Sequence, residues 1–284
     1  MTRPLRSVLY LPANRASAVA KAREADCDAV ILDLEDAVAP VEKDHARAEA
    51  AAVVVTGGFG HRLLVVRANA PDSDWGRADL VSLAKAGPAA VLLPKVSDVA
   101  TLREARSHLP AEIALWAMVE TCAAMPDLGT IAREGSALGL QALVVGTNDL
   151  ALEMRCSLGG GRAAVLPLLT QTVVAARAHG LAAIDGVFND IADEDGLAAE
   201  AAQGALLGFD GKTVIHPRQL ETVNAAFAPT DEAVERSRRV AEAFAAPENS
   251  GKGVIKVDGK MTELLHLREA ERIIAQADAI AARD

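Results

Sequence analysis

The chain has 284 residues, of which 51% are hydrophobic and only 3% aromatic, and its formal net charge is −10. This length is close to that of one (β/α)8 barrel with a short extension, and a core of Ala, Val, Leu and Ile is typical of α/β folds. No cluster of Lys and Arg with interleaved aromatic residues occurs, so the sequence excludes the electrostatic footprint of a nucleic-acid-binding protein.

Cysteine usage and hydropathy indicate the compartment. Cys27, Cys122 and Cys156 form neither a disulfide framework nor a C-x-x-C pair, which fits a reducing environment. No apolar run approaches the roughly 18 residues of a membrane span, and the N-terminus lacks the apolar core of a signal peptide. We therefore expect a cytoplasmic protein without a membrane partner.

Short β-branched runs alternate with Ala-rich amphipathic stretches over residues 1–227, a pattern typical of βα units around a parallel sheet. The runs predict eight strands, at residues 7–11, 29–34, 63–67, 90–93, 114–119, 142–145, 181–184 and 212–215. The stretches between them predict helices beginning near residues 15, 43, 74, 98, 125, 166, 193 and 217, with Asp98 and Asp193 as N-cap residues. Eight strands with eight helices predict an α/β fold of the (β/α)8 TIM-barrel type, with residues 1–227 as the catalytic domain.

After Phe227 the repeat stops and the chain changes character. A charged helical stretch at 230–246 precedes a turn-rich linker at 247–253, a short apolar run at 253–257 and a final helix ending near residue 282. This tail is too small for an independent domain. We expect residues 228–284 to form a C-terminal helical arm or lid that packs on its own barrel or a neighbouring one.

Polar residues follow most of the apolar runs. They are Asp33, Glu35, Arg67, Asn69, Lys95, Glu120, Asp149, Asp185 and His216. Because the carboxyl ends of the strands meet on one face of a parallel barrel, where the active sites of this fold lie, the pattern predicts a site there. The alternative for each residue taken singly is a strand end that is polar only to meet water.

Glu120 and Asp149 follow the fifth and sixth strands, so their carboxylates are expected side by side in the barrel mouth. Two hard oxygen ligands with open positions for water and substrate suit Mg²⁺. Zinc is disfavoured because the six histidines form no H-x-H or H-E-x-x-H spacing. The alternative for either acid is a structural ion pair with Arg67 or Lys95.

Arg67 ends the third predicted strand. Its guanidinium offers a rigid, bidentate donor fork for a carboxylate or a developing oxyanion. A salt bridge to Asp33 or Glu35 is the structural alternative, and it is compatible with a catalytic role because a catalytic Arg needs an acidic partner to orient it.

Eight different short motifs are distributed along essentially the whole chain. They read RSVLYLPANR at 6–15, LDLEDAV at 32–38, VRAN at 66–69, LPKV at 93–96, MVET at 118–121, GTNDL at 146–150, GFDGKTVIHP at 208–217 and DGKM at 258–261. In this order they resemble the citrate lyase beta subunit-like proteins of the HpcH/HpaI aldolase/citrate lyase superfamily, which include malyl-CoA and citramalyl-CoA lyases.

The resemblance implies roles for residues at matching positions. Glu120 and Asp149 match the two magnesium ligands, and Arg67 matches an arginine that contacts the carboxylate and carbonyl oxygens of the substrate. Glu35 and Asp36 fall on an acidic motif that supports the metal waters and this arginine. Asp258 matches a catalytic acid that acts on the acyl carbon from a C-terminal lid, often that of an adjacent subunit.

Further positions are implied for the ligands, a CoA thioester and a small 2-oxoacid. Tyr10, Arg15 and Lys21 match residues that contact coenzyme A. Asn148 falls in the motif that lines the oxoacid pocket, and His216 lies at the barrel mouth, where it is a candidate ligand contact or simply the start of a helical turn. Familiar family members form trimers or hexamers, so we expect a homotrimer or hexamer.

The expected activity is a Mg²⁺-dependent acyl-CoA lyase that joins or cleaves a carbon–carbon bond between glyoxylate, pyruvate or oxaloacetate and acetyl-CoA or propionyl-CoA. Two catalytic alternatives remain open. One is a thioesterase that hydrolyses the same malyl-type CoA ester, and the other is a true citrate lyase beta subunit acting on a citryl-acyl-carrier-protein thioester. A non-catalytic scaffold is disfavoured, since a scaffold has no need of Arg67, Glu120, Asp149 and Asp258 together.

Overall fold

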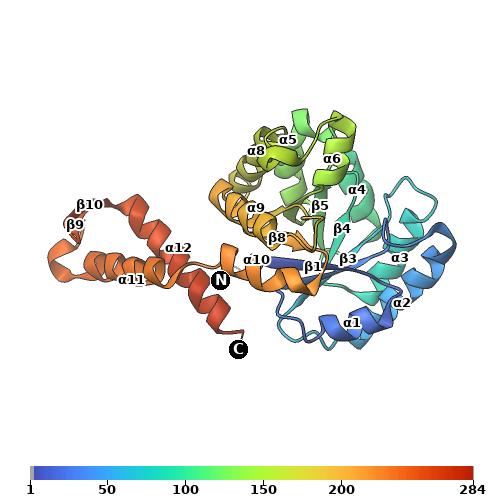
Figure 1. Ribbon diagram of the computed structural model, residues 1–284, viewed down its shortest axis with the longest axis horizontal. Helices are drawn as coiled ribbons and strands as arrows, with labels where there is room; N and C mark the ends of the chain where they lie inside the picture. The colour runs from blue at the N-terminus through green and yellow to red at the C-terminus, as the bar shows by residue number, and fades with distance from the viewer. Residues whose placement is uncertain (1–2, 284) are drawn as a thin grey trace. The chain divides into compact units, whose positions relative to one another are not determined.

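The computed structural model describes residues 3–283 and contains a closed barrel of eight parallel strands in the order β1 to β8 (Figure 1). The strands are β1 Ser7–Pro12, β2 Ala29–Asp33, β3 Leu63–Arg67, β4 Ala90–Leu93, β5 Ala114–Val119, β6 Leu140–Val145, β7 Ala182–Asp185 and β8 Gly211–Val214. Each strand pairs with its neighbours in the sequence, and β1 pairs with β8 to close the sheet. The predicted TIM-barrel fold is confirmed.

Helices follow the strands and surround the barrel. They are α1 Ala16–Ala22, α2 Lys43–Thr56, α3 Gly76–Ala86, α4 Val99–His108, α5 Ala124–Ala137, α6 Thr147–Met154, α7 Gly159–Arg162, α8 Leu166–Ala178, α9 Glu194–Leu207 and α10 Leu220–Phe227. Asp98 and Asp193 accept N-cap hydrogen bonds from the backbone of Thr101 and Gly196, as predicted. Among the described residues, no helix is both long and apolar enough to cross a membrane.

Two helix boundaries differ from the prediction. The segment at Pro217 is a short 3-10 turn, Pro217–Gln219, and α10 begins only at Leu220. The helix α6 was not predicted, and it begins two residues after β6. Asp149 therefore lies in the first turn of α6 and not at the strand end. In the first turn of a helix, a negative charge is stabilised by the positive end of the helix dipole.

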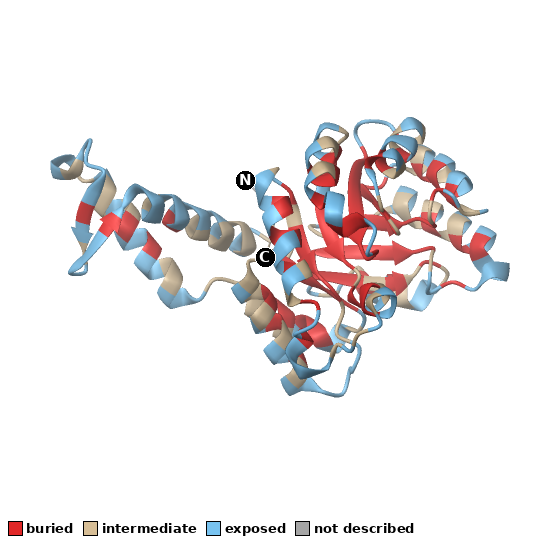
Figure 2. Ribbon diagram, turned by 90° about the horizontal axis from the view of Figure 1, so that it is seen from above, coloured by how far each residue is buried: buried red, intermediate tan, exposed pale blue. Residues whose placement is uncertain are grey.

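The strands alternate between two apolar layers, since successive side chains of a strand point to opposite faces. In β5, Ala114, Trp116 and Met118 point into the barrel and pack with side chains of other strands. Leu115 and Val119 point outward and pack beneath the helices. The strands are accordingly buried on both faces, whereas the helices expose one side (Figure 2).

This alternation also fixes where the polar residues point. Ile31, Val65 and Met118 point into the barrel, and side chains two positions apart on a strand point to the same face. Asp33, Arg67 and Glu120, two residues further along, therefore also point inward. Tyr10 occupies the same layer in β1 and packs against the inner cluster. A belt of polar side chains thus lines the carboxyl end of the barrel.

Residues 228–283, with Arg3 and Pro4, form a second compact unit. It contains α11 Asp231–Ala245, the antiparallel strands β9 Val254–Val257 and β10 Lys260–Glu263, and α12 Leu264–Ala281. Asp258 and Gly259 form the two-residue turn of this hairpin, both with positive φ, at 50° and 78°. The strand β10 was not predicted, although an Asp-Gly pair between extended runs is a strong hairpin signal.

Closure of the barrel depends on a glycine at the start of β8. A Cβ on Gly211 would lie 1.8 Å from the backbone oxygen of Leu5 and 2.5 Å from that of Arg6. We expect Gly211→Ala to lower the free energy of unfolding by about 1–3 kcal/mol or more, because backbone must move. Gly129→Ala in α5, where nothing lies within 4 Å, is the matched control and should be neutral or slightly stabilising. Urea denaturation measures both, and equal effects would contradict this account of closure.

Candidate active site

Arg67 is the best-anchored side chain of the polar belt. Its Nε and Nη2 each donate to a carboxylate oxygen of Asp33 at 2.7 Å, a bidentate pair. Its Nη1 lies 2.7 Å from Glu35 Oε2 and 3.4 Å from Asp36 Oδ2. The structural ion pairs expected for Arg67 are therefore present, and they hold the guanidinium at a fixed place in the mouth.

Tyr10 packs on the same guanidinium, whose Cζ lies 5.1 Å from the ring centroid. The phenol hydroxyl contacts Met118 Sδ at 3.9 Å. Burial raises the pKa of Tyr10 above its usual value, although the charge of Arg67 opposes this shift. Tyr10 is thus a neutral phenol beside a charged guanidinium.

Glu120 is fully buried and is held from the backbone. The amide of Lys95 donates to Glu120 Oε1 at 2.7 Å, and Lys95 adopts a positive φ of 53° to do so. Space for the carboxylate comes from Gly146, where a Cβ would lie 2.4 Å from Glu120 Oε2. Burial raises the pKa of Glu120, and Oε2 has no hydrogen-bond partner. Such an unsatisfied buried oxygen calls for a ligand or an ion.

The side chain of Lys95 joins the two predicted metal ligands. Its ammonium forms an ion pair with Asp149 and lies 3.6 Å from Glu120 Oε1. Burial lowers the pKa of Lys95, but the hydrogen bond to Asp149 and the charge of Glu120 outweigh it, so the net pKa is raised. Glu120 and Asp149 therefore face one cation from β5 and α6, and the ion pairs proposed as their alternative also exist.

These two carboxylates fit a magnesium ion. Both offer hard oxygens, and Mg²⁺ keeps several waters when it binds to one or two carboxylates, so it needs no third protein ligand. The described residues contain no cluster of three or more His, Cys, Asp or Glu placed for a metal. The unpartnered Oε2 of Glu120 supplies a free acceptor at the site.

Other predicted ligand contacts lie outside this ion cluster. Asn148 exchanges two amide hydrogen bonds with Asn189, at 3.1 and 2.8 Å, and both side chains are exposed. Arg15 precedes α1 and Lys21 lies in its last turn, and both are exposed. His216 is half-buried and its Nδ1 accepts from the backbone of Arg218 at 3.2 Å, which caps the 3-10 turn.

Asp258 belongs to the second compact unit. It is exposed in the turn between β9 and β10, and its Oδ2 accepts from Arg239 Nε at 3.1 Å. The left-handed backbone at this position is tolerated by Asp and Gly, which explains the Asp-Gly sequence. The turn presents a charged carboxylate at the tip of a hairpin.

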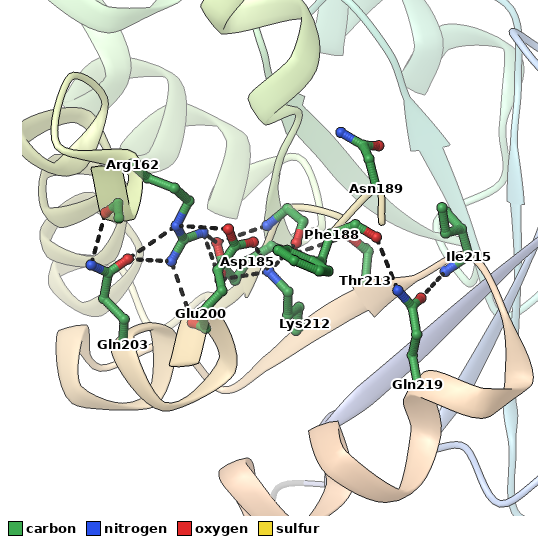
Figure 3. Close-up of polar contacts among 12 residues, drawn as sticks. Arg162, Asp185, Phe188, Asn189, Glu200, Gln203, Lys212, Thr213, Ile215 and Gln219 are labelled. Carbon is green, nitrogen blue, oxygen red and sulfur yellow. Dashed lines mark hydrogen bonds and ion pairs between the residues drawn. The ribbon is translucent and has the colours of Figure 1, made fainter. Parts of the chain in front are cut away.

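A second buried charge network was not predicted as a unit. Figure 3 shows Arg162 and Lys212 converging on Asp185, with contacts at 2.8 and 3.1 Å. Lys212 also lies 2.7 Å from Glu200 of α9, and Gln203 accepts from Arg162. The sequence signal for this network was Lys212, a charged residue inside the apolar run of β8. The prediction that Asp185 lines the barrel mouth is wrong, because Asp185 lies in the outward-facing layer, where Arg162 and Lys212 both pair with it.

Glu35 provides a pH dependence. Burial, the largest cause, raises its pKa from 4.5 to about 8, although Arg67 opposes the shift. The folded protein therefore binds this proton more tightly than the unfolded chain does. Without divalent metal, the free energy of unfolding should fall as the pH rises from about 4.5 to about 8. Glu35→Gln should make this fall shallower in urea denaturation, and parallel curves would contradict the assignment.

Comparisons with known proteins agree with this fold. The family model described as HpcH/HpaI aldolase/citrate lyase matches residues 6–217, and a model described as a C-C bond lyase of the TIM-barrel fold matches residues 163–281. The chain is 47% identical to a (3S)-malyl-CoA thioesterase of Cereibacter sphaeroides, over 98% of this chain and 96% of the relative. It is 31% identical to the citrate lyase subunit beta of Escherichia coli, over 100% and 96%, and to the mitochondrial citramalyl-CoA lyase of Rattus norvegicus, over 98% and 87%.

Solved structures add ligands for related proteins. A CitE protein of Mycobacterium tuberculosis, solved with magnesium, acetoacetate and coenzyme A, matches with a TM-score of 0.79 and 32% identity, over 97% of this chain and 98% of that one. A citrate lyase of Burkholderia xenovorans matches with a TM-score of 0.83 over 99% and 93%, and at 20% identity it supports the fold alone.

The fold and the polar mouth define a TIM-barrel enzyme of carbon–carbon lyase type. The chain belongs to the HpcH/HpaI aldolase/citrate lyase family, as the sequence motifs predicted.

Proposed function

We propose that the protein acts on the coenzyme A thioester of a small 2-hydroxy dicarboxylic acid, with (3S)-malyl-CoA as the first candidate, and hydrolyses it to the free acid. The observation that carries the proposal is the pair Glu120 and Asp149, which face one cation in the mouth of the barrel. The substrate class is supported by the malyl-CoA thioesterase relatives at 47% identity. The same relatives support hydrolysis of the thioester in place of the carbon–carbon bond cleavage expected from the sequence.

Glu120 and Asp149 are proposed to hold Mg²⁺, the ion named with the related CitE protein. When bound, Mg²⁺ supplies a Lewis acid that polarises substrate oxygens and stabilises the negative charge that develops on them. The orphaned Oε2 of Glu120 and the half-exposed position of Asp149 leave these acids able to bind an ion that keeps part of its hydration shell.

Arg67 is proposed to bind the carboxylate and the thioester carbonyl oxygen. Asp33 accepts hydrogen bonds from Nε and Nη2 of Arg67. These bonds fix the guanidinium with its Nη1 next to Glu35 and Asp36. A pKa of about 8 suits the Glu35 carboxyl to exchange a proton with a reacting oxygen near neutral pH. In hydrolysis, a water oxygen bonds to the carbonyl carbon, the C–S bond breaks, and coenzyme A leaves as the thiol.

The remaining predicted residues are proposed to bind the ends of the substrate. Tyr10 would contact the thioester from the inner layer, and Arg15 and Lys21 would pair with the phosphates of coenzyme A. Asn148 and His216 would contact the acid portion. Asp258, on its hairpin tip, is proposed to act on the acyl group as a general acid or base.

Cleavage of a carbon–carbon bond is the second candidate. It is favoured by the relatives named citramalyl-CoA lyase and citrate lyase subunit beta and by the C-C bond lyase family model. The same site would serve, because the CoA thioester of a 2-hydroxy acid, once its hydroxyl proton is removed, can break to a 2-oxoacid and the enolate of acetyl-CoA. Asp258 would then protonate that enolate.

Product analysis separates the two outcomes. We expect (3S)-malyl-CoA incubated with the protein and Mg²⁺ to give free malate and coenzyme A, as judged by mass spectrometry. Glyoxylate and acetyl-CoA as the main products would establish the lyase reaction instead. No turnover of malyl-CoA or of a citramalyl-CoA control would contradict the proposed substrate class.

Removal of either metal ligand tests the site itself. We expect Glu120→Gln and Asp149→Asn each to lower kcat/KM by about 100-fold or more. Each variant removes a negative charge proposed to hold Mg²⁺, which would stabilise the charge of the transition state. Glu134→Gln is the matched control, because Glu134 forms surface ion pairs with Arg103 and Arg133, and its replacement should leave turnover unchanged. Undiminished Mg²⁺-dependent turnover in the first two variants would overturn the assignment.

A further inference from the structure

We propose that Lys95 is a resident counter-ion of the metal site, whose ammonium neutralises Glu120 and Asp149 in the metal-free protein and is displaced when a divalent cation binds. This inference rests on the proposed metal ligands. Its geometric basis is a single ammonium in contact with Asp149 and 3.6 Å from Glu120 Oε1, the place where both acids point.

Lys95 carries two separable interactions. Its backbone amide orients Glu120 by a hydrogen bond of 2.7 Å, which does not depend on the side chain. The side chain is 37% exposed, so it can leave the acids and re-enter water without opening the core. The same residue can therefore hold Glu120 in place both with and without a bound metal.

Charge explains why displacement is expected. With one ammonium, the two carboxylates are left with one net negative charge, while the negative charge of Asp33 is offset by Arg67. A divalent cation beside the ammonium would meet a like charge at close range, which costs free energy. Binding of the metal must thus break the pair between Lys95 and Asp149, and this lowers the apparent metal affinity.

Metal titration of the full-length protein tests the inference. After treatment with EDTA and its removal, Mn²⁺ binding is measured by electron paramagnetic resonance and Mg²⁺ binding by calorimetry. We expect Lys95→Met to bind Mn²⁺ about fivefold more tightly, the effect of losing one partly exposed ion pair. Lys95→Arg keeps the charge and should stay near the wild-type affinity, as should Lys85→Met in α3, which removes a lysine elsewhere.

Thermal denaturation gives a second readout. The metal-free Lys95→Met protein should melt below the wild type, because two acids then lack their counter-ion, and added Mg²⁺ should raise its melting temperature by more than that of the wild type. Lys95→Gln is the second variant if the Met protein does not fold. It also removes the charge and keeps an unbranched side chain at the positive φ.

The outcomes distinguish this inference from the proposed function. A wild type that binds Mn²⁺, with Lys95→Met and Lys95→Gln proteins that bind it equally or more weakly, would overturn the counter-ion role and leave the metal site standing. A purely structural role for Lys95 would give that weaker binding. A wild type that binds no Mn²⁺ would overturn both the counter-ion role and the proposed metal ligands.

Discussion

The contact on which the site depends is that of two carboxylates, Glu120 and Asp149, with one cation. A buried carboxylate is costly unless a positive charge or donors accompany it, and Glu120 is fully buried. The sequence meets this cost with the backbone amide of Lys95 on one oxygen and leaves the other oxygen unsatisfied. A site that is incompletely neutralised in this way is ready to bind a cation.

The second charge network shows what a purely structural arrangement looks like in the same barrel. Asp185 receives two cationic partners, Arg162 and Lys212, and Lys212 has a further acidic partner in Glu200. Each of the two cations pairs with both acids, Asp185 and Glu200, between the sheet and the helices. Removing one partner would strand a buried charge, at a cost of about 3–5 kcal/mol, so this network stabilises β7 and β8. The contrast separates a closed ionic core from the barrel mouth, where Asp149 is partly exposed.

The family membership explains why one arrangement of residues can serve more than one reaction. Relatives of this chain carry the names of a thioesterase, a citramalyl-CoA lyase and a citrate lyase subunit. Hydrolysis of a thioester breaks a C–S bond and cleavage by a lyase of this kind breaks a C–C bond, and in both reactions negative charge develops on an oxygen atom. Binding of that charge by the barrel is common chemistry, whereas the bond that breaks depends on which atom receives water or a proton.

Much of this molecule follows from local sequence. Short, continuous apolar runs predicted the eight strands and the barrel, because successive side chains of a barrel strand are buried alternately inside the barrel and beneath the helices. Polar residues at the run ends located the mouth. Tertiary structure alone decided that Asp149 sits on a helix, that Lys95 bridges the two acids, and that Asp185 belongs to a separate network outside the barrel lumen. Those facts depend on strand register and on charges that meet across distant segments, and a pattern read along one chain contains neither.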